Sequence, residues 1–127
     1  MRRAALGAAF ALAATSAAAT PGPAEDYVLH CSGCHQQNGA GVPNLVPPLS
    51  GLAPFLDTLE GRAYLVRVPG VAQAALDDER LAALLNWVMR EMSGTQPSPA
   101  YDAHEVHALR ADPLRDARAQ REIVLGR

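Results

Sequence analysis

The sequence contains no lysine and few aromatic residues. All 11 basic residues are Arg, and 13 acidic residues give the chain of 127 residues a formal net charge of −2. This balance offers little attraction to phosphate groups, so we expect no nucleic-acid partner. Aromatic residues make up only 5% of a chain that is 49% hydrophobic. Such a chain is too apolar to be wholly disordered but has few large rings, so its composition suggests that another group fills part of a small core.

No hydrophobic run in the sequence is long enough to cross a membrane. The run from Ala4 to Ala14 has about 11 residues, whereas a transmembrane helix needs about 20. The run follows two Arg residues and leads into three alanines that end at Ala19, and small residues of this kind suit signal peptidase. We predict that residues 1–19 are a secretory signal peptide, cleaved near Ala19, and that the mature protein is periplasmic with no membrane span. The alternative is an N-terminal membrane anchor, for which the run is short.

Convincing strand signals are also absent, and the periodic patterns predict an all-α fold. The clearest helix begins after Asp77 or Asp78, either of which can cap it, and ends before Gly94. Its apolar positions recur three or four residues apart and are Leu81, Leu84, Leu85, Val88 and Met92. This rhythm is that of a helix with one buried face.

Two further segments complete a predicted compact domain over residues 20–94. A shorter helix is expected from about Ala24 into Cys31. The run Tyr64–Val68 fits either a short strand or the end of a helix that begins near Thr58. At this length the chain has room for one such domain and a tail.

Residues 95–127 are predicted to form a linker and a helical C-terminal extension. The linker follows Gly94 and contains Pro97 and Pro99, and Gly and Pro interrupt helices. Asp102 and Glu105 have the spacing of a capping box, and Asp112 followed by Pro113 resembles an N-cap with Pro at the first helical position. We therefore expect two short helices. The apolar residues of the extension are numerous enough to need burial, so we expect it to pack against the domain.

The two cysteines of the chain stand in the string Cys31-Ser-Gly-Cys34-His35. This is the attachment signal for c-type haem, in which each thiol adds to one vinyl group and the adjacent His binds the iron. Two thiols three residues apart on one helical turn reach both vinyl groups along one porphyrin edge. The sequence therefore predicts one covalent haem c, held by Cys31 and Cys34, with His35 as the proximal axial ligand.

Three other interpretations of the motif compete with haem. A thioredoxin-like redox pair needs a preceding strand and an α/β fold, for which the sequence gives no signal. A zinc site lacks an obvious fourth ligand at the usual spacing. A disulfide between residues so close together closes a tight loop and stabilises little. The predicted export favours haem, because haem is attached to thiols outside the cytoplasm.

The domain resembles a class I monohaem cytochrome c. Tyr27 and Trp87 resemble the aromatic residues at which the first and last helices of that family cross, and His35 resembles its proximal ligand. The loop after the motif is similar as well, and in it Pro47 stands twelve residues beyond the His. The resemblance implies that the Pro47 carbonyl accepts a hydrogen bond from the imidazole Nδ1–H and that Leu49 lies against the porphyrin.

The second axial ligand departs from the resembled family. There it is usually a Met in the loop before the last helix, but residues 67–76 contain neither Met nor His. Three possibilities remain open: no strong protein ligand, a sulfur of Met89 or Met92, or an imidazole of His104 or His107 in the extension. Both Met residues lie on or beside the apolar stripe, where core packing is the commoner role.

Two functional classes are consistent with these features. In the first, the protein is a periplasmic electron carrier, or the haem subunit of a dehydrogenase, that serves a periplasmic redox partner protein and has no catalytic site of its own. In the second, an open or weakly held distal position binds a small ligand, as in a sensor or a peroxidase-like protein. No catalytic triad, carboxylate pair or phosphate-binding loop points to any other chemistry.

Overall fold

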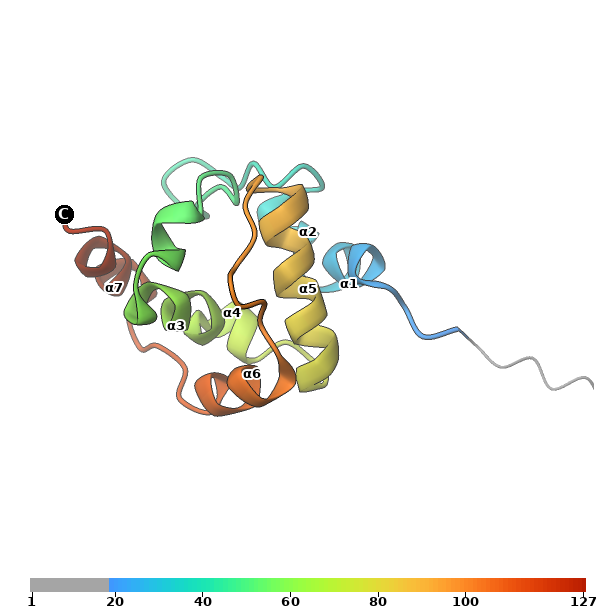
Figure 1. The fold of residues 1–127 in the computed structure, drawn as a ribbon. Helices are drawn as coiled ribbons and strands as arrows, with labels where there is room; N and C mark the ends of the chain where they lie inside the picture. Colours follow the sequence, from blue (N-terminus) through green and yellow to red (C-terminus); the bar gives the residue numbers. More distant parts are fainter. Residues whose placement is uncertain (1–18) are drawn as a thin grey trace, which may run out of the picture.

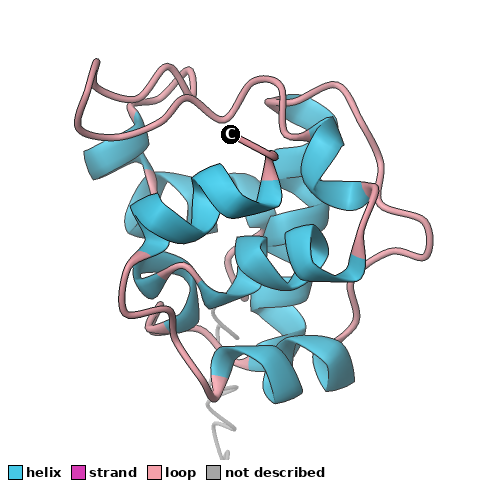
Figure 2. Cartoon of the chain, turned by 90° about the vertical axis from the view of Figure 1, so that its left-hand side faces the viewer, coloured by secondary structure: helices cyan, strands magenta, loops and turns pink. Residues whose placement is uncertain are grey.

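The computed structural model describes residues 19–127, and these residues form a small helical domain (Figure 1). Residues 1–18, which make up all but the last residue of the predicted signal peptide, lie outside the described residues. The helices are α1 (Pro23–His30), α2 (Ser32–His35), the 3-10 helix η1 (Ala53–Leu56), α3 (Leu59–Arg67), α4 (Pro69–Ala72), α5 (Asp78–Glu91), α6 (Ala103–Arg110) and α7 (Ala117–Val124). Over this range only helices and loops are drawn, and pairing of strand type is limited to one isolated bridge between Val42 and Val46 (Figure 2). The predicted all-α fold is confirmed.

Helix α5 is the longest helix of the described domain and packs against α1 (Figure 1). Asp77 caps it by accepting a hydrogen bond of 2.8 Å from the backbone N–H of Arg80, as predicted. Its predicted apolar face is buried at Leu81, Leu84, Leu85 and Val88. On the α1 side the rings of Tyr27 and Trp87 meet with centroids 5.5 Å apart. The predicted contact between the first and last helices of the domain is therefore present.

A buried ion pair also joins α1 to α5. Asp26 is only 1% exposed, and its carboxylate accepts hydrogen bonds from the guanidinium of Arg80. A carboxylate so deeply buried is tolerated only when a partner compensates for the lost hydration. The pair therefore fixes the angle at which α1 enters the haem motif.

Helix α3 confirms the helical alternative for the run that ends at Val68. The side chain of Thr58 caps it, accepting a hydrogen bond of 3.0 Å from Gly61 N. Gly61 is also a packing requirement, because a Cβ there would lie 2.4 Å from the backbone oxygen of Phe55. The close approach lets the rings of Phe55 and Tyr64 stack with centroids 5.1 Å apart, so η1 and α3 form one rigid corner of the domain.

The extension packs on the domain, as predicted, and α6 lies against both α5 and α3. Val106 of α6 is fully buried, and the Tyr101 ring is only 3% exposed. The Tyr101 hydroxyl donates a hydrogen bond of 3.0 Å to the Arg62 carbonyl, and burial raises its pKa well above the usual range. Arg62 in turn binds both carboxylate oxygens of Glu105, at 2.6 and 2.8 Å. These contacts make Tyr101 and Val106 part of the core.

The prediction of a second helix in the extension was correct, but its predicted start was wrong. Asp102 caps α6 as expected, whereas α7 begins at Ala117 and is capped by Asp116 rather than by Asp112. The reason is an interaction with α3: Arg67 donates hydrogen bonds to the backbone and side chain of Asp112. The Leu114 N–H then donates to the Arg67 carbonyl, so this segment is used for docking and the helix starts later.

A search of the described part of the chain finds no helix long and apolar enough to cross a membrane.

Candidate haem site

The haem motif consists of Cys31, which separates α1 from α2, and of α2 itself. The N–H of Cys31 closes α1 with a hydrogen bond of 2.9 Å to the Tyr27 carbonyl, and the N–H of His35 bonds the Cys31 carbonyl at 2.9 Å. The two cysteines therefore stand on one tight turn, as attachment to a single porphyrin edge requires. Both thiols are free; Cys31 is half-buried and Cys34 is exposed.

The electrostatics of Cys31 argue against a redox-active thiol pair. Burial raises its pKa, and the negative charges of Asp26 and of a Cys34 thiolate raise it further. Catalytic cysteines have lowered pKa values, because the thiolate is the nucleophile. A thiol held neutral at Cys31 does not fit the thioredoxin-like alternative.

His35 is held in one tautomer by the loop that follows it. Its Nδ1 lies 3.1 Å from the carbonyl oxygen of Pro47, which is the bond that the resemblance implies. Because a carbonyl only accepts, Nδ1 carries the proton and Nε2 keeps a lone pair for a metal. Burial lowers the pKa of His35, although the hydrogen bond to Pro47 opposes this shift. The neutral imidazole that ligates a metal is thus the favoured form.

The loop between α2 and η1 is shaped by glycine. Gly41 has a φ of +69°, and a Cβ there would lie 2.3 Å from the Val46 carbonyl oxygen and 2.8 Å from that of Pro47. Hydrogen bonds between Val42 and Val46 close the turn, and the side-chain amide of Gln36 donates to the Gly41 carbonyl at 2.6 Å. Only glycine permits this approach, and the approach places the Pro47 carbonyl beside His35.

A cavity of about 720 Å³ adjoins this loop, in the size range of cofactor sites. Pro47 belongs both to its wall and to the hydrogen bond with His35. The wall is mostly apolar and consists of Ala40, Val42, Pro43, Asn44, Leu45, Val46, Pro47 and Pro48 from the loop, Tyr64 and Val68 from α3 and its end, and Ala117 and Arg118 from α7. Cys31, Cys34 and His35 are not among the lining residues, so Pro47 alone relates the cavity to the motif. The free thiols and the tautomer-locked imidazole are the features that suit covalent haem.

The remaining residues singled out from the sequence near the motif are packed. Leu49 is half-buried and contacts the core beside Gly39. Met89 is 1% exposed within the core. Met92 is half-buried, and its Sδ lies 3.0 Å from the position of a Cβ on Gly39. None of these three side chains lines the cavity.

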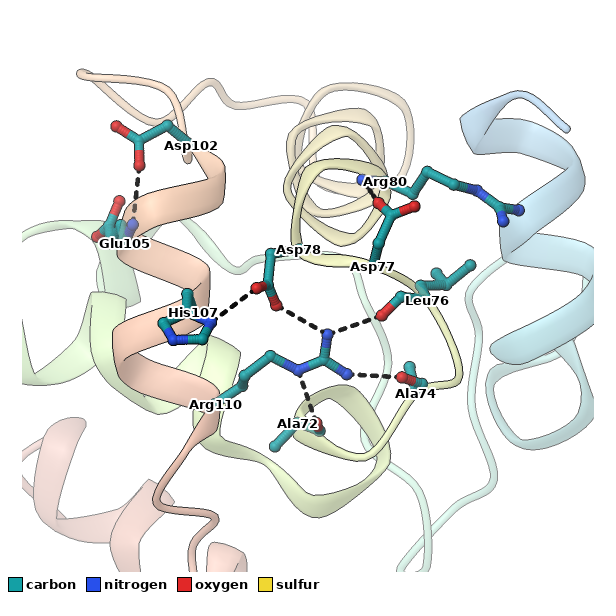
Figure 3. Close-up of polar contacts among 10 residues, drawn as sticks. All are labelled: Ala72, Ala74, Leu76, Asp77, Asp78, Arg80, Asp102, Glu105, His107 and Arg110. Atoms are coloured by element: carbon teal, nitrogen blue, oxygen red, sulfur yellow. Dashed lines mark hydrogen bonds and ion pairs between the residues drawn. The ribbon is translucent and has the colours of Figure 1, made fainter. Parts of the chain in front are cut away.

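The two histidines of the extension also lie away from the cavity. His104 is exposed and borders a second hollow, of about 540 Å³, between α3, α6 and α7. The Nδ1 of His107 lies 2.9 Å from a carboxylate oxygen of Asp78 (Figure 3). His107 and Arg110 together hold the pKa of Asp78 below its usual range, with the bond to His107 the larger cause.

Arg110 is a structural residue that sequence reasoning missed. Its guanidinium donates hydrogen bonds to three backbone carbonyls, at 2.9, 2.8 and 2.6 Å, and also to Asp78 (Figure 3). The three carbonyls belong to Ala72, Leu76 and Ala74. The extension therefore fixes the segment between α4 and α5, where the resembled family places its Met. A single Arg in a short helix gives no sequence signal for this role.

A zinc site is not supported. Within residues 19–127, three His, Cys, Asp or Glu side chains nowhere gather in a way that could hold a metal ion. Cys31, Cys34 and His35 thus do not form the closed ligand set of a structural zinc.

The small all-α domain and its CxxCH turn beside an apolar cavity place this chain in the class of proteins that bind haem covalently. The chain is 37% identical over 109 aligned residues to cytochrome c-552 of Thermus thermophilus, and the match covers 66% of this chain and 81% of that protein. A second cytochrome c-552 of the same species is also 37% identical, with 72% of its length covered. No protein-family model matches the chain. This chain belongs to the class I c-type cytochromes, electron carriers that contain covalently bound haem c.

The aligned stretch of this chain is shorter than that of its relative. Since 66% of 127 residues is fewer than the 109 aligned positions, the relative has residues at aligned positions where this chain has none. This chain thus forms its domain with a shorter stretch than the relative.

Proposed function

We propose that the protein carries single electrons through one haem attached to Cys31 and Cys34, with His35 as the proximal ligand of the iron. The observation that carries this proposal is the bond of 3.1 Å between His35 Nδ1 and the Pro47 carbonyl, because it leaves Nε2 free on a turn that also holds both thiols. The bound haem supplies an iron that alternates between two oxidation states. The chain holds the imidazole, excludes water and sets the polarity around the iron.

Beyond Cys31, Cys34 and His35, the residues around the site would support it without forming bonds to the haem. Pro47 fixes the imidazole plane, and its bond makes the ligand more electron-rich. Leu49 supports the loop from the core side, and we propose that it also contacts the porphyrin, as the resemblance implies. Residues 20–94 would form the haem domain, and residues 95–127 would form an extension that covers it. No residue is assigned to catalysis, so any enzymatic role would be that of a haem subunit.

The redox partner is proposed to be another protein of the periplasm. Residues 1–19 have the pattern of an export signal, and haem attachment outside the cytoplasm agrees with export. Cys34 is exposed, which would bring one haem edge to the surface for electron transfer. Val28 and Leu29, in the turn before Cys31, are 55% and 68% exposed and add apolar surface close to the motif in sequence.

The test is the mass and redox behaviour of the exported protein. We expect the mass of the chain from Thr20 onward plus one haem, retained after extraction with acidified acetone, and a reversible one-electron reduction. Cys31→Ser and Cys34→Ser should each leave at most one thioether, and the double variant should lose the haem to the extract. Ser32→Ala, at a half-buried residue of the same turn whose hydroxyl bonds the Val28 carbonyl, is the control and should keep both thioethers. Extraction of the haem from the unmodified protein would overturn the proposed attachment.

A further inference from the structure

The backbone leaves the haem motif through a conformation that side chains rarely adopt. Gln36, which directly follows His35, has a φ of +63° and a ψ of 168°. Residues other than glycine seldom occupy this region, because their Cβ crowds the backbone there. They remain in it only where surrounding contacts hold them, and strain of this kind is concentrated at functional sites. Contacts strong enough to outweigh the strain must therefore hold Gln36 in place.

Two hydrogen bonds from side chains hold Gln36. The Tyr27 hydroxyl donates to the Gln36 carbonyl at 2.6 Å, and the side-chain amide of Gln36 donates to the Gly41 carbonyl at 2.6 Å. The backbone adds two more, since the N–H of Gly39 donates to the Gln36 carbonyl at 3.3 Å and the N–H of Gly41 donates to the His35 carbonyl at 3.0 Å. The carbonyl of His35 and that of the next residue are thus both fixed.

The Tyr27 hydroxyl is a buried donor whose partner is next to the ligand. Tyr27 is only 1% exposed, and its ring contacts Trp87 at the crossing of α1 and α5. A phenylalanine ring would pack in the same way, so packing alone does not account for the hydroxyl. The hydrogen bond that it donates goes to the Gln36 carbonyl. The hydroxyl therefore links the helix crossing to the residue after His35.

The Gln36 amide is linked to His35 through the loop. Its acceptor, Gly41, lies so close to Pro47 that a Cβ on Gly41 would be 2.8 Å from the Pro47 carbonyl oxygen. The same oxygen lies 3.1 Å from Nδ1 of His35. The contacts thus form a closed ring that runs from Gln36 through Gly41 and Pro47 and back to His35. A change at Gln36 therefore moves the acceptor on which the imidazole orientation depends.

We propose that Tyr27 and Gln36 are positioning residues, which together hold the Pro47 carbonyl against His35 so that the imidazole keeps its plane as a ligand of the iron. This inference rests on the proposed function, in which His35 is the proximal ligand. A firm hydrogen bond at Nδ1 makes the imidazole more electron-rich, and an electron-rich ligand stabilises the oxidised iron. Loosening either contact should therefore raise the reduction potential.

The first test is Tyr27→Phe in the haem protein, a change that removes the hydroxyl and keeps the ring. We expect the equilibrium constant for reduction to rise about threefold, or about 28 mV for a one-electron couple, with the haem still covalently attached. Potentiometry measures this shift. We also expect the Nδ1 proton of His35 to exchange faster with solvent, which NMR spectroscopy measures, because its acceptor is held less firmly.

Tyr101→Phe is the matched control. The Tyr101 hydroxyl is also buried and also donates to a backbone carbonyl, that of Arg62, at 3.0 Å. Its loss should lower the midpoint of thermal unfolding about as much as Tyr27→Phe does, but it should leave the potential and the exchange rate unchanged. An unchanged potential in Tyr27→Phe would overturn the inference. An equal shift in both variants would also overturn it, because a general loss of stability would then explain the change.

The second test uses the strain at Gln36. Gln36→Gly removes the amide but also relieves the strain of the positive φ, so its two effects on stability oppose each other. We expect the midpoint of unfolding to change little while the equilibrium constant for reduction rises about threefold. Gln37→Gly, at an exposed residue without a positive φ, adds similar freedom one position further along and should leave the potential unchanged. Equal potentials in the two glycine variants would remove Gln36 from the proposed role.

Failure of this inference can be told apart from failure of the proposed function. Covalent haem with an unchanged potential in both Tyr27→Phe and Gln36→Gly would defeat this inference alone. Haem lost on extraction from the unmodified protein would defeat the proposed function and, with it, this inference.

Discussion

At the scale of single residues, the Asp26–Arg80 pair is the contact whose loss should cost most. Arg80→Ala leaves the carboxylate of Asp26, 1% exposed, without its cation. Breaking a buried pair costs about 3–5 kcal/mol, and because Arg80 is partly exposed we expect a loss of about 3 kcal/mol. Urea unfolding of the haem protein measures it. Arg90→Ala, which breaks the exposed pair with Glu91, is the control and should cost less than about 1 kcal/mol.

Gly41 is a second residue at which a small substitution should have a large effect on stability and on the reduction potential. Gly41→Ala would bring a Cβ within 2.3 Å of the Val46 carbonyl oxygen at a φ of +69°, so the loop must move and carry the Pro47 carbonyl with it. We expect destabilisation of about 1–3 kcal/mol and a changed reduction potential, because the bond to His35 is disturbed. Potentiometry and thermal unfolding measure these. Gly70→Ala has nothing within 4 Å of the added Cβ, and an unchanged Gly41→Ala protein would contradict the argument.

The roles of some residues in this region could be predicted from their spacing along the chain, and the roles of others could not. Cys31, Cys34 and His35 were predicted because the chemistry of attachment fixes their separation along the chain, and Pro47 follows from its distance to the His in the resembled family. Tyr64 and Arg110 were not predicted as parts of this region. Their roles depend on long-range packing: Arg110 binds carbonyls more than thirty residues away along the chain, which no local pattern encodes.

At the scale of elements, the crossing of α1 and α5 depends on Trp87. Its ring is half-buried and lies at 42° to that of Tyr27. We expect Trp87→Ala to cost about 3 kcal/mol, the lower end for truncation of Trp, while the haem remains attached. Thermal unfolding followed by circular dichroism, with the mass of the haem protein as a check, measures both. If the midpoint of unfolding hardly changed, Trp87 would be better regarded as part of a docking surface.

The junction between α6 and α5 should respond to acid through Asp78. Because His107 and Arg110 lower the pKa of Asp78 in the folded protein, the junction stabilises the fold above the ordinary pKa of about 4. This contribution is lost as the pH falls through the lower, folded-state pKa. Asp78→Asn should therefore lower the melting temperature at pH 7 and show a smaller difference from the unmodified protein at pH 3. Asp57→Asn is the control, and a difference that grew on acidification would contradict the sign.

The helices were predictable where a cap and an apolar stripe agreed. Asp77 before the stripe of α5 and Asp102 before α6 both cap as expected, because N-cap chemistry acts over three residues. The start of α7 was not predictable in this way. The sequence around Asp112 suits an N-cap, but Arg67 of α3 binds its side chain and backbone. This contact between residues 45 positions apart keeps Asp112 from capping α7.

At the scale of the whole molecule, removal of α7 alone and removal of both α6 and α7 should have different effects on stability. Helix α6 contributes fully buried Val106, and the segment before it contributes Tyr101, whose backbone forms two hydrogen bonds of 2.9 Å with the Asn86 side chain. Helix α7 has no buried residue, and its Ala117 and Arg118 line the cavity that adjoins the Pro47 loop. Deleting residues 112–127 should therefore leave a folded haem protein, whereas deleting residues 95–127 exposes the faces of α3 and α5 and should lower the melting temperature by more than about 10 °C.

Ligand access tests the same division at the level of function. The shorter deletion should raise the rate at which cyanide reaches the iron, because it uncovers the loop whose Pro47 bonds His35, while the core built on Val106 stays intact. Arg118→Gln tests the wall without a deletion, and Arg115→Gln, an exposed residue that does not line the cavity, is its control. Stopped-flow mixing with cyanide measures the rate. Equal rates in the full-length and shortened proteins would mean that α7 does not limit entry. Its contribution would then be to the fold, through the packing of Ala117 and Val124 and the stacking of Arg121 over the Phe55 ring.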